Sequence, residues 1–220
     1  MSTATTNRHQ ELIEKLPPAS TLILHGISWE EYEELLDALG EANGLRVSYD
    51  QGTLQIMTLS TRHEKYVRLI DNMVSLFSIK RRIKVLCYGS ATMKKQHKLK
   101  GAEPDSCFYV QNAALVGGKS EIDFSIDAPP DVVVEVDLGH DSLSKFPIYA
   151  ALGVPEIWRY DGEFMTMYHL VQDRYVTAPA SQALPALSSD TLTEFLSRSH
   201  HEDQYEVLLA FESWLQAPEQ

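Results

Sequence analysis

The chain has 220 residues, 44% of them hydrophobic, and a formal net charge of −12 at pH 7. This composition excludes wholesale disorder, and the sequence shows neither a bilayer-length apolar run nor a secretory signal, which predicts a cytoplasmic protein without a membrane partner. The acidic balance excludes a generally basic surface, so contact with a nucleic acid must be local. Positive charge gathers in Lys80, Arg81, Arg82 and Lys84 and in Lys94, Lys95, Lys98 and Lys100, which favours solvated surface or, alternatively, a flank that meets a polyanion.

The first half of the chain predicts a leader, a helix, a hairpin and a second, longer helix. Ser28 and Glu31 match a capping box and predict a helix that begins at Trp29. Beyond it, side-chain periodicity predicts a β-hairpin and then a helix with one core-facing stripe. The predicted ranges are a flexible leader over 1–19, a helix over 29–39, hairpin strands over 46–49 and 53–59, and a helix over 62–79.

The second half of the chain predicts strands around a valine-rich segment. Residues 131–137, DVVVEVD, are almost continuously apolar, which is typical of a central strand covered on both faces. Ser142 is placed to cap the following helix, and the last helix is expected to turn Tyr205, Leu208 and Leu209 toward the core. The other predicted elements are strands over 85–88, 91–94 and 101–110, a helix over 142–152, a hairpin over 155–160 and 164–170, and two C-terminal helices. Together they predict a single α/β domain over residues 20–220, with helices covering a central sheet.

Two acids fall in predicted strands. Asp105 stands where a polar loop enters a strand, and Glu135 lies inside the valine-rich strand on the same face as Val133 and Asp137. Aspartate is common at loop entrances, and a salt bridge near a sheet edge is the structural alternative for Glu135. A carboxylate in so apolar a strand is nevertheless costly unless it is paired or binds a cation. The two acids together therefore predict a divalent-metal site.

Glu64, with His63 beside it, and Lys145 are further candidates. Each has an ordinary explanation, since the helix dipole favours an acid in the first turn, His63 fits an exposed cap residue, and most helical lysines are solvated. Hard cations such as Mg²⁺ keep several waters, so one or two carboxylates suffice to bind them. A metal so held stabilises charge on a phosphate, and a nearby lysine adds to that stabilisation. If the two strand acids bind a metal, these residues are compatible with chemistry at a phosphate.

Other catalytic arrangements are not present in the sequence. It contains no glycine-rich phosphate loop, no HExxH spacing and no nucleophile elbow, which argues against a P-loop enzyme, a zinc peptidase and a serine hydrolase. Cys87 and Cys107 lack metal-ligand spacing and predict buried free thiols in a reducing compartment.

Four segments together resemble a bacterial restriction-endonuclease family of the PD-(D/E)XK nuclease superfamily, first described as a domain of unknown function and common in cyanobacteria. They are YDQGTLQIMTLSTRHEKY (49–66), GAEPDSCFYV (101–110), PPDVVVEVDLGHDS (129–142) and KFPIYAALGVPEIWRYD (145–161). The resemblance implies a restriction-endonuclease-like α/β fold, in which a central mixed sheet is flanked by helices. It also implies that acids from two neighbouring strands bind Mg²⁺ or Mn²⁺.

The resemblance assigns roles by position. It makes Asp105 and Glu135 the strand acids, Glu64 the helical acid that joins them, and the backbone carbonyl of Val136 a further metal ligand. The third position of the (D/E)XK half-motif is an aspartate, Asp137, so the catalytic lysine is expected from the next helix, at Lys145. An inward-pointing Asp137 would repel the phosphate by roughly 4 kcal/mol at about 4 Å in a partly desolvated site.

Three functions remain open from the sequence. The leading hypothesis is a Mg²⁺-dependent deoxyribonuclease, an endonuclease that cleaves DNA as a homodimer. The alternative, favoured by Asp137 and the acidic balance, is a degenerate nuclease fold that serves as a nucleic-acid or protein interaction module. The third is a structural oligomer whose dimer surface involves the 155–170 hairpin and Trp214, although core packing is the simpler interpretation of those residues.

Overall fold

The computed structural model describes residues 9–40, 44–119, 121–139 and 141–217, which form two β-sheets and the helices around them. The larger sheet has six strands in the order β11-β10-β9-β8-β7-β4. In this sheet β8 and β9 run parallel and the other neighbours are antiparallel, so the predicted mixed sheet is confirmed. Its strands are β4 (Leu86–Cys87), β7 (Ser106–Tyr109), β8 (Val132–Val136), β9 (Glu156–Tyr160), β10 (Met165–Val171) and β11 (Arg174–Ala178).

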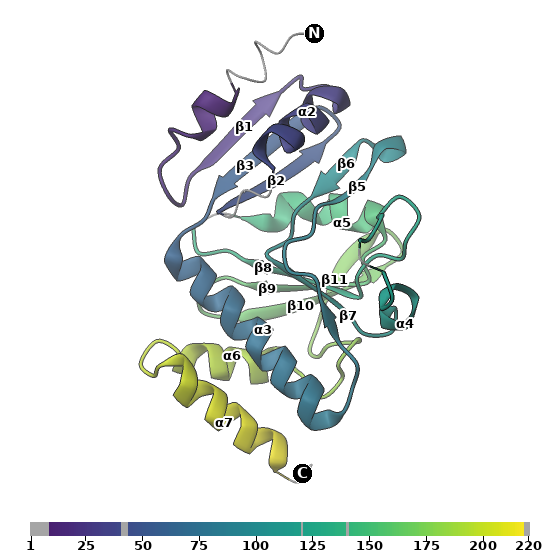
Figure 1. Cartoon of the computed structure of the whole chain (residues 1–220). Coiled ribbons are helices and arrows are strands. Elements are labelled where there is room, and N and C mark those ends of the chain that lie inside the picture. The colour runs from purple at the N-terminus through teal and green to yellow at the C-terminus, as the bar shows by residue number, and fades with distance from the viewer. Residues whose placement is uncertain (1–8, 41–43, 120, 140, 218–220) are drawn as a thin grey trace.

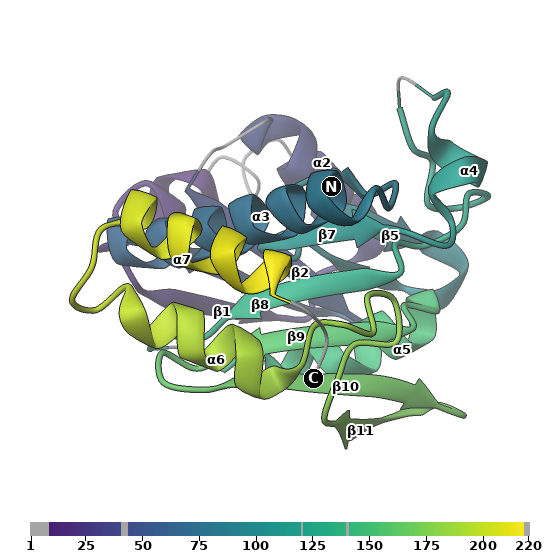
Figure 2. The same cartoon turned by 90° about the horizontal axis from the view of Figure 1, so that it is seen from below.

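Helices cover both faces of the larger sheet, as predicted (Figures 1 and 2). One face packs against α3 (Thr61–Arg81), α6 (Ser189–Arg198) and α7 (Gln204–Gln216), and the other against α4 (Ala113–Val116) and α5 (Phe146–Leu152). Alternate residues of β8 therefore enter different cores: Val134 faces α3, and Val133 faces α5. Since β8 is buried on both faces, its run of valines is explained by packing.

The smaller sheet is antiparallel, in the order β1-β3-β2-β6-β5, and α2 (Trp29–Leu39) packs against it. Ser28 and Glu31 form the predicted capping box at the start of α2. In Figure 1, α5 lies between the two sheets. The strands are β1 (Thr21–His25), β2 (Leu45–Asp50), β3 (Thr53–Thr58), β5 (Met93–Lys95) and β6 (Lys100–Ala102), with the short 3₁₀ helix η1 (Gln96–Lys98) between the last two.

The connection from β8 to β9 returns the chain across the α5 face of the larger sheet. It contains a 3₁₀ turn, η2 (Ser142–Lys145), which runs directly into α5. Gly153 ends α5 with a φ of 86°, a left-handed conformation that glycine adopts without strain. Because β8 and β9 are parallel, the crossover has to pass over the sheet, and it carries Lys145 back over the strand that bears Glu135.

Several sequence predictions are wrong in detail. Asp141, and not Ser142, caps the helical segment after β8. In α7 the buried residues are Val207, Phe211 and Leu215; of the predicted stripe, Leu208 packs against the core as expected, whereas Tyr205 and Leu209 are exposed. Cys107 is buried as predicted, but Cys87 is exposed. Strands β1 and β11 were not predicted at all.

Part of the predicted leader is ordered in the structure. Residues 9–13 are helical, and Ile13 is buried in the core of the smaller sheet, whereas residues 1–8 lie outside the described part of the chain. The division into a leader over 1–19 and one domain over 20–220 remains a prediction. Among the described helices, none combines the length and apolarity required to cross a membrane.

Candidate active site

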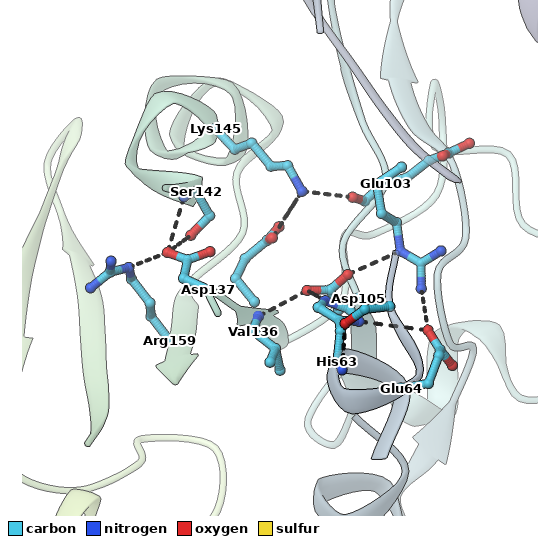
Figure 3. A network of polar contacts seen from close by, with 12 residues as sticks. His63, Glu64, Glu103, Asp105, Val136, Asp137, Ser142, Lys145 and Arg159 are labelled. Carbon is cyan, nitrogen blue, oxygen red and sulfur yellow. Dashed lines mark hydrogen bonds and ion pairs between the residues drawn. The ribbon is translucent and has the colours of Figure 1, made fainter. Parts of the chain in front are cut away.

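Asp105 lies just before β7, on the edge shared with β8. Its backbone N–H donates to the Val134 carbonyl over 3.0 Å, which fixes the residue at the end of the strand pair. Its carboxylate is 2% exposed and accepts three hydrogen bonds. Arg46 Nε lies 3.1 Å from Oδ1, while His63 Nε2 and the Val136 backbone N lie 2.9 and 2.8 Å from Oδ2. Figure 3 shows the carboxylate enclosed by these groups.

The partners of Asp105 keep it ionised. Burial by itself would raise the pKa of Asp105, but the hydrogen bond and charge of His63, together with the charges of Lys145 and Arg46, hold this pKa below its usual value. His63 was interpreted from the sequence as an exposed cap residue, which is wrong because only 6% of it is exposed.

Glu135 forms the second half of the site, from the middle of β8. Lys145 Nζ lies 2.8 Å from Glu135 Oε2 and 3.1 Å from Oε1, and Tyr149 donates its hydroxyl to Oε1. The same ammonium group donates to the Glu103 carbonyl over 3.2 Å. Glu135 and Lys145 are 0% and 1% exposed, so this ion pair is fully desolvated.

The two members of this pair respond to burial in different ways. Burial raises the pKa of Glu135 to about 7, against the opposing charge of Lys145. Burial alone would lower the pKa of Lys145, but the charges of Glu135 and Asp105 hold it above its usual value. Lys145 therefore remains cationic at neutral pH, and Asp105 contributes to the negative field that surrounds it.

Glu64 stands at the rim of the site. It is 37% exposed, and its Oε1 lies 3.8 Å from an Arg46 terminal nitrogen and 3.7 Å from His63 Nδ1. The structure therefore connects Glu64 to Asp105 through Arg46 and His63. Of the four predicted catalytic side chains, Asp105, Glu135 and Lys145 are brought together in the interior, whereas Glu64 is partly exposed.

Asp137 is neutralised on the side of β8 that faces β9. Its Oδ2 accepts from Arg159 Nε over 2.5 Å, and from the backbone N–H and hydroxyl of Ser142, each over 3.0 Å. Arg159 is the β9 residue in register with Glu135. The expected phosphate repulsion is thus reduced by a paired cation, and Asp137 instead holds the start of the segment that carries Lys145 (Figure 3).

The donor set fits a hard divalent cation that keeps part of its water shell. Within the described residues there is no group of three or more His, Cys, Asp or Glu side chains that could hold a metal. Two carboxylates, Asp105 and Glu135, are nevertheless buried on adjoining strands, and Mg²⁺ needs only one or two. The Val136 N–H points toward Asp105, and the carbonyl of a strand residue faces the same edge as its N–H, so the Val136 oxygen is directed to the same side.

The second predicted basic group is engaged within the protein. Lys94 and Lys100 form ion pairs with Glu33 and Asp50, at 2.6 and 2.5 Å. Lys95 and Lys98 donate to the carbonyls of Leu152 and Ala151 at the C-terminal end of α5. These contacts favour the structural interpretation of this lysine group, because a helix C-terminus stabilises nearby cations.

Sequence reasoning missed two partners in the site, Arg46 and Arg159. Arg46 is 59 residues from Asp105 in the chain, and no local pattern signals such a pairing. Arg159 did leave a signal, because it is a charged residue inside the otherwise largely apolar β9, as Glu135 is inside β8.

Comparison with known proteins gives one family model and a similar solved structure. Residues 29–199 match the model of the Uma2 family, which is described as "putative restriction endonuclease". A similar solved structure, from Anabaena variabilis, is described as a putative nuclease belonging to DUF820. It has a TM-score of 0.47 and 16% identity, covering 68% of this chain and 90% of that one. A search of curated proteins gives no match.

Proposed function

Because the chain belongs to the Uma2 family of restriction-endonuclease-like proteins, we propose that it is a divalent-metal-dependent endonuclease that hydrolyses phosphodiester bonds in DNA. Family membership supports a nuclease, and the finer assignment depends on the site. The observation that carries it is the burial of Asp105 and Glu135 on adjoining strands, with the Lys145 ammonium group 2.8 Å from Glu135. Carboxylates so thoroughly desolvated are costly without a cationic partner.

We propose Asp105, Glu135 and the Val136 carbonyl as the metal ligands, with Glu64 contributing from the rim. A Mg²⁺ or Mn²⁺ ion in this position supplies charge stabilisation at the phosphate and lowers the pKa of a bound water. The chain itself supplies a fixed positive charge, since Lys145 is held by Glu135 and by the Glu103 carbonyl. Preorganised charge of this kind stabilises the additional negative charge of a phosphodiester transition state.

Tyr149 and Asp137 position these groups in the proposed mechanism. The Tyr149 hydroxyl donates to Glu135 Oε1, which restricts the rotation of the carboxylate. Asp137 binds Ser142 at the start of η2 and so fixes the backbone from which Lys145 projects. Both contacts keep the acid and the lysine aligned before substrate arrives.

We also propose that the enzyme works as a cytoplasmic homodimer. A two-fold dimer presents two sites to the two strands of a duplex. The exposed apolar side chains of α7, Tyr205 and Leu209, provide a surface on which a second copy can pack.

Metal binding and cleavage measured together test the proposal. Mn²⁺ and Mg²⁺ binding is followed by calorimetry, and plasmid cleavage is assayed in the same buffers, for wild type, Asp105→Asn and Glu135→Gln. Glu156→Gln is the matched control, because Glu156 is equally buried in the same sheet but binds Trp158 and the backbone N–H groups of Gln182 and Ala183.

Loss of both binding and cleavage in the two site variants, with both retained in the control, supports the nuclease. Metal binding by wild type without cleavage of any DNA form favours the degenerate interaction module. A wild-type protein that binds neither metal contradicts the proposed chemistry.

A further inference from the structure

The Arg46 guanidinium stands between two acids that are proposed as metal ligands. It extends from β2 of the smaller sheet, and its side chain is 7% exposed. Its Nε lies 3.1 Å from Asp105 Oδ1, and a terminal nitrogen lies 3.8 Å from Glu64 Oε1. The third nitrogen donates to the Leu45 carbonyl over 2.8 Å. A protein cation thus bridges the two acids.

A metal ion that binds Asp105 has to compete with cations and donors already in contact with its carboxylate. One carboxylate oxygen is bound by Arg46, and the other by His63 and the Val136 N–H. Of these partners, Arg46 carries a permanent charge and is repelled by a divalent cation at short range. Arg46 is therefore the partner that a metal displaces.

Space for this movement exists beside the site. Arg46 lines a hollow of about 380 Å³ together with Val47, Tyr88, Thr92 and Glu103, among others. The hollow is bounded by the C-terminal end of α2, by β2 and by the segment that leads into β5, so open volume lies beside the arginine.

We propose that Arg46 is the resident counter-ion of the metal-free site and becomes a phosphate ligand when it leaves Asp105. This inference rests on the proposed function and assigns a residue of the smaller sheet to substrate binding. A guanidinium that binds a carboxylate also matches the geometry of a phosphate. Lys94 and Lys100 are already paired with acids, so they offer less free positive charge to a substrate than the sequence indicated.

Arg46→Gln separates this role from a structural one. Removing the competing cation is expected to raise Mn²⁺ affinity by about tenfold in calorimetry with the metal alone. The affinity for a DNA duplex, measured by fluorescence anisotropy in Ca²⁺, is expected to fall by about tenfold. A residue that only supported the fold would weaken the binding of both Mn²⁺ and DNA when it is removed.

Arg68→Gln is the matched control, because Arg68 lies 3.7 Å from Glu64 but is 64% exposed. Its affinities for Mn²⁺ and for DNA should both stay within about twofold of wild type.

Unchanged or weaker Mn²⁺ binding by Arg46→Gln overturns the counter-ion role, and unchanged DNA affinity overturns the phosphate role. If the glutamine variant does not fold, Arg46→Lys decides. It retains the charge but not the planar fork, so Mn²⁺ affinity should match wild type while DNA affinity falls, and any other pattern overturns the inference. Failure of the proposed function gives a different result, in which wild type binds Mn²⁺ and DNA but cleaves nothing.

Discussion

The buried pair of Lys145 and Glu135 allows a direct test of the site's electrostatics without metal or substrate. In Lys145→Met the ammonium group is lost and the aliphatic volume is largely retained. Glu135, which is 0% exposed, then keeps the Tyr149 hydroxyl but no cation. Breaking one side of a buried ion pair typically costs about 3–5 kcal/mol.

The loss of folding stability in Lys145→Met should increase as pH rises. Burial already raises the pKa of Glu135 to about 7, and removing Lys145 raises it further, because the lysine charge opposes that shift. At a pH below the usual pKa of a glutamate, Glu135 is neutral in both the folded and the unfolded variant, so the loss of Lys145 costs little there. As pH rises, the unfolded chain ionises freely while the folded variant must keep a buried, unpaired acid, so stability falls by up to about 1.4 kcal/mol per pH unit.

Urea unfolding in EDTA at pH 5.5 and pH 8 measures this effect through tryptophan fluorescence, since Trp29 and Trp158 are buried in the folded protein. The difference from wild type should be larger at pH 8, and the double variant Lys145→Met, Glu135→Gln should recover most of it. A loss below about 1 kcal/mol at pH 8, or a loss independent of pH, would show that the two side chains are not a desolvated pair.

Three further changes test other parts of the structure. Asp137→Asn should cost about 1.5–3 kcal/mol in urea unfolding, because Arg159 and Ser142 lose a charged acceptor, and it should slow cleavage while calorimetric Mn²⁺ affinity is retained. Trp158→Ala should cost about 3–5 kcal/mol, since the ring is fully buried in the core; a smaller loss would mean that this core can collapse around the cavity. Ser28→Ala should cost about 1 kcal/mol in thermal unfolding by removing the α2 cap, and an unchanged midpoint would contradict that role.

Local signals were sufficient to predict much of the fold. Cap residues and apolar periodicity located α2, α3 and the β2–β3 hairpin, and the valine run located β8. Strands β1 and β11 lie at sheet edges and contain no fully buried residue, so neither shows a clear apolar face. The α7 stripe was only partly right, with Leu208 against the core and Tyr205 and Leu209 exposed, because apolar residues occur on more than one side of that helix.

Some residues of the candidate site could likewise be predicted from the sequence, and others could not. Asp105 and Glu135 could be selected because acids are costly in apolar strands, and Lys145 because it follows on the next helical segment. Arg46 and His63 could not be assigned as partners of Asp105, since they belong to segments 59 and 42 residues away and only the packing of the smaller sheet and α3 brings them near. The sequence likewise indicated an unpaired acid at Asp137, because its partner, Arg159, could not be identified.

The unequal exposure of the two cysteines gives the protein an internal probe of local opening. Cys107 lies in β7, two residues after Asp105, and is buried, whereas Cys87 lies in β4 and is exposed. Burial raises the pKa of the Cys107 thiol, so this thiol can be alkylated only when the core between the larger sheet and α5 opens. The rate at which Cys107 reacts, taken relative to Cys87, therefore measures how often the core beside Asp105 opens in the native protein.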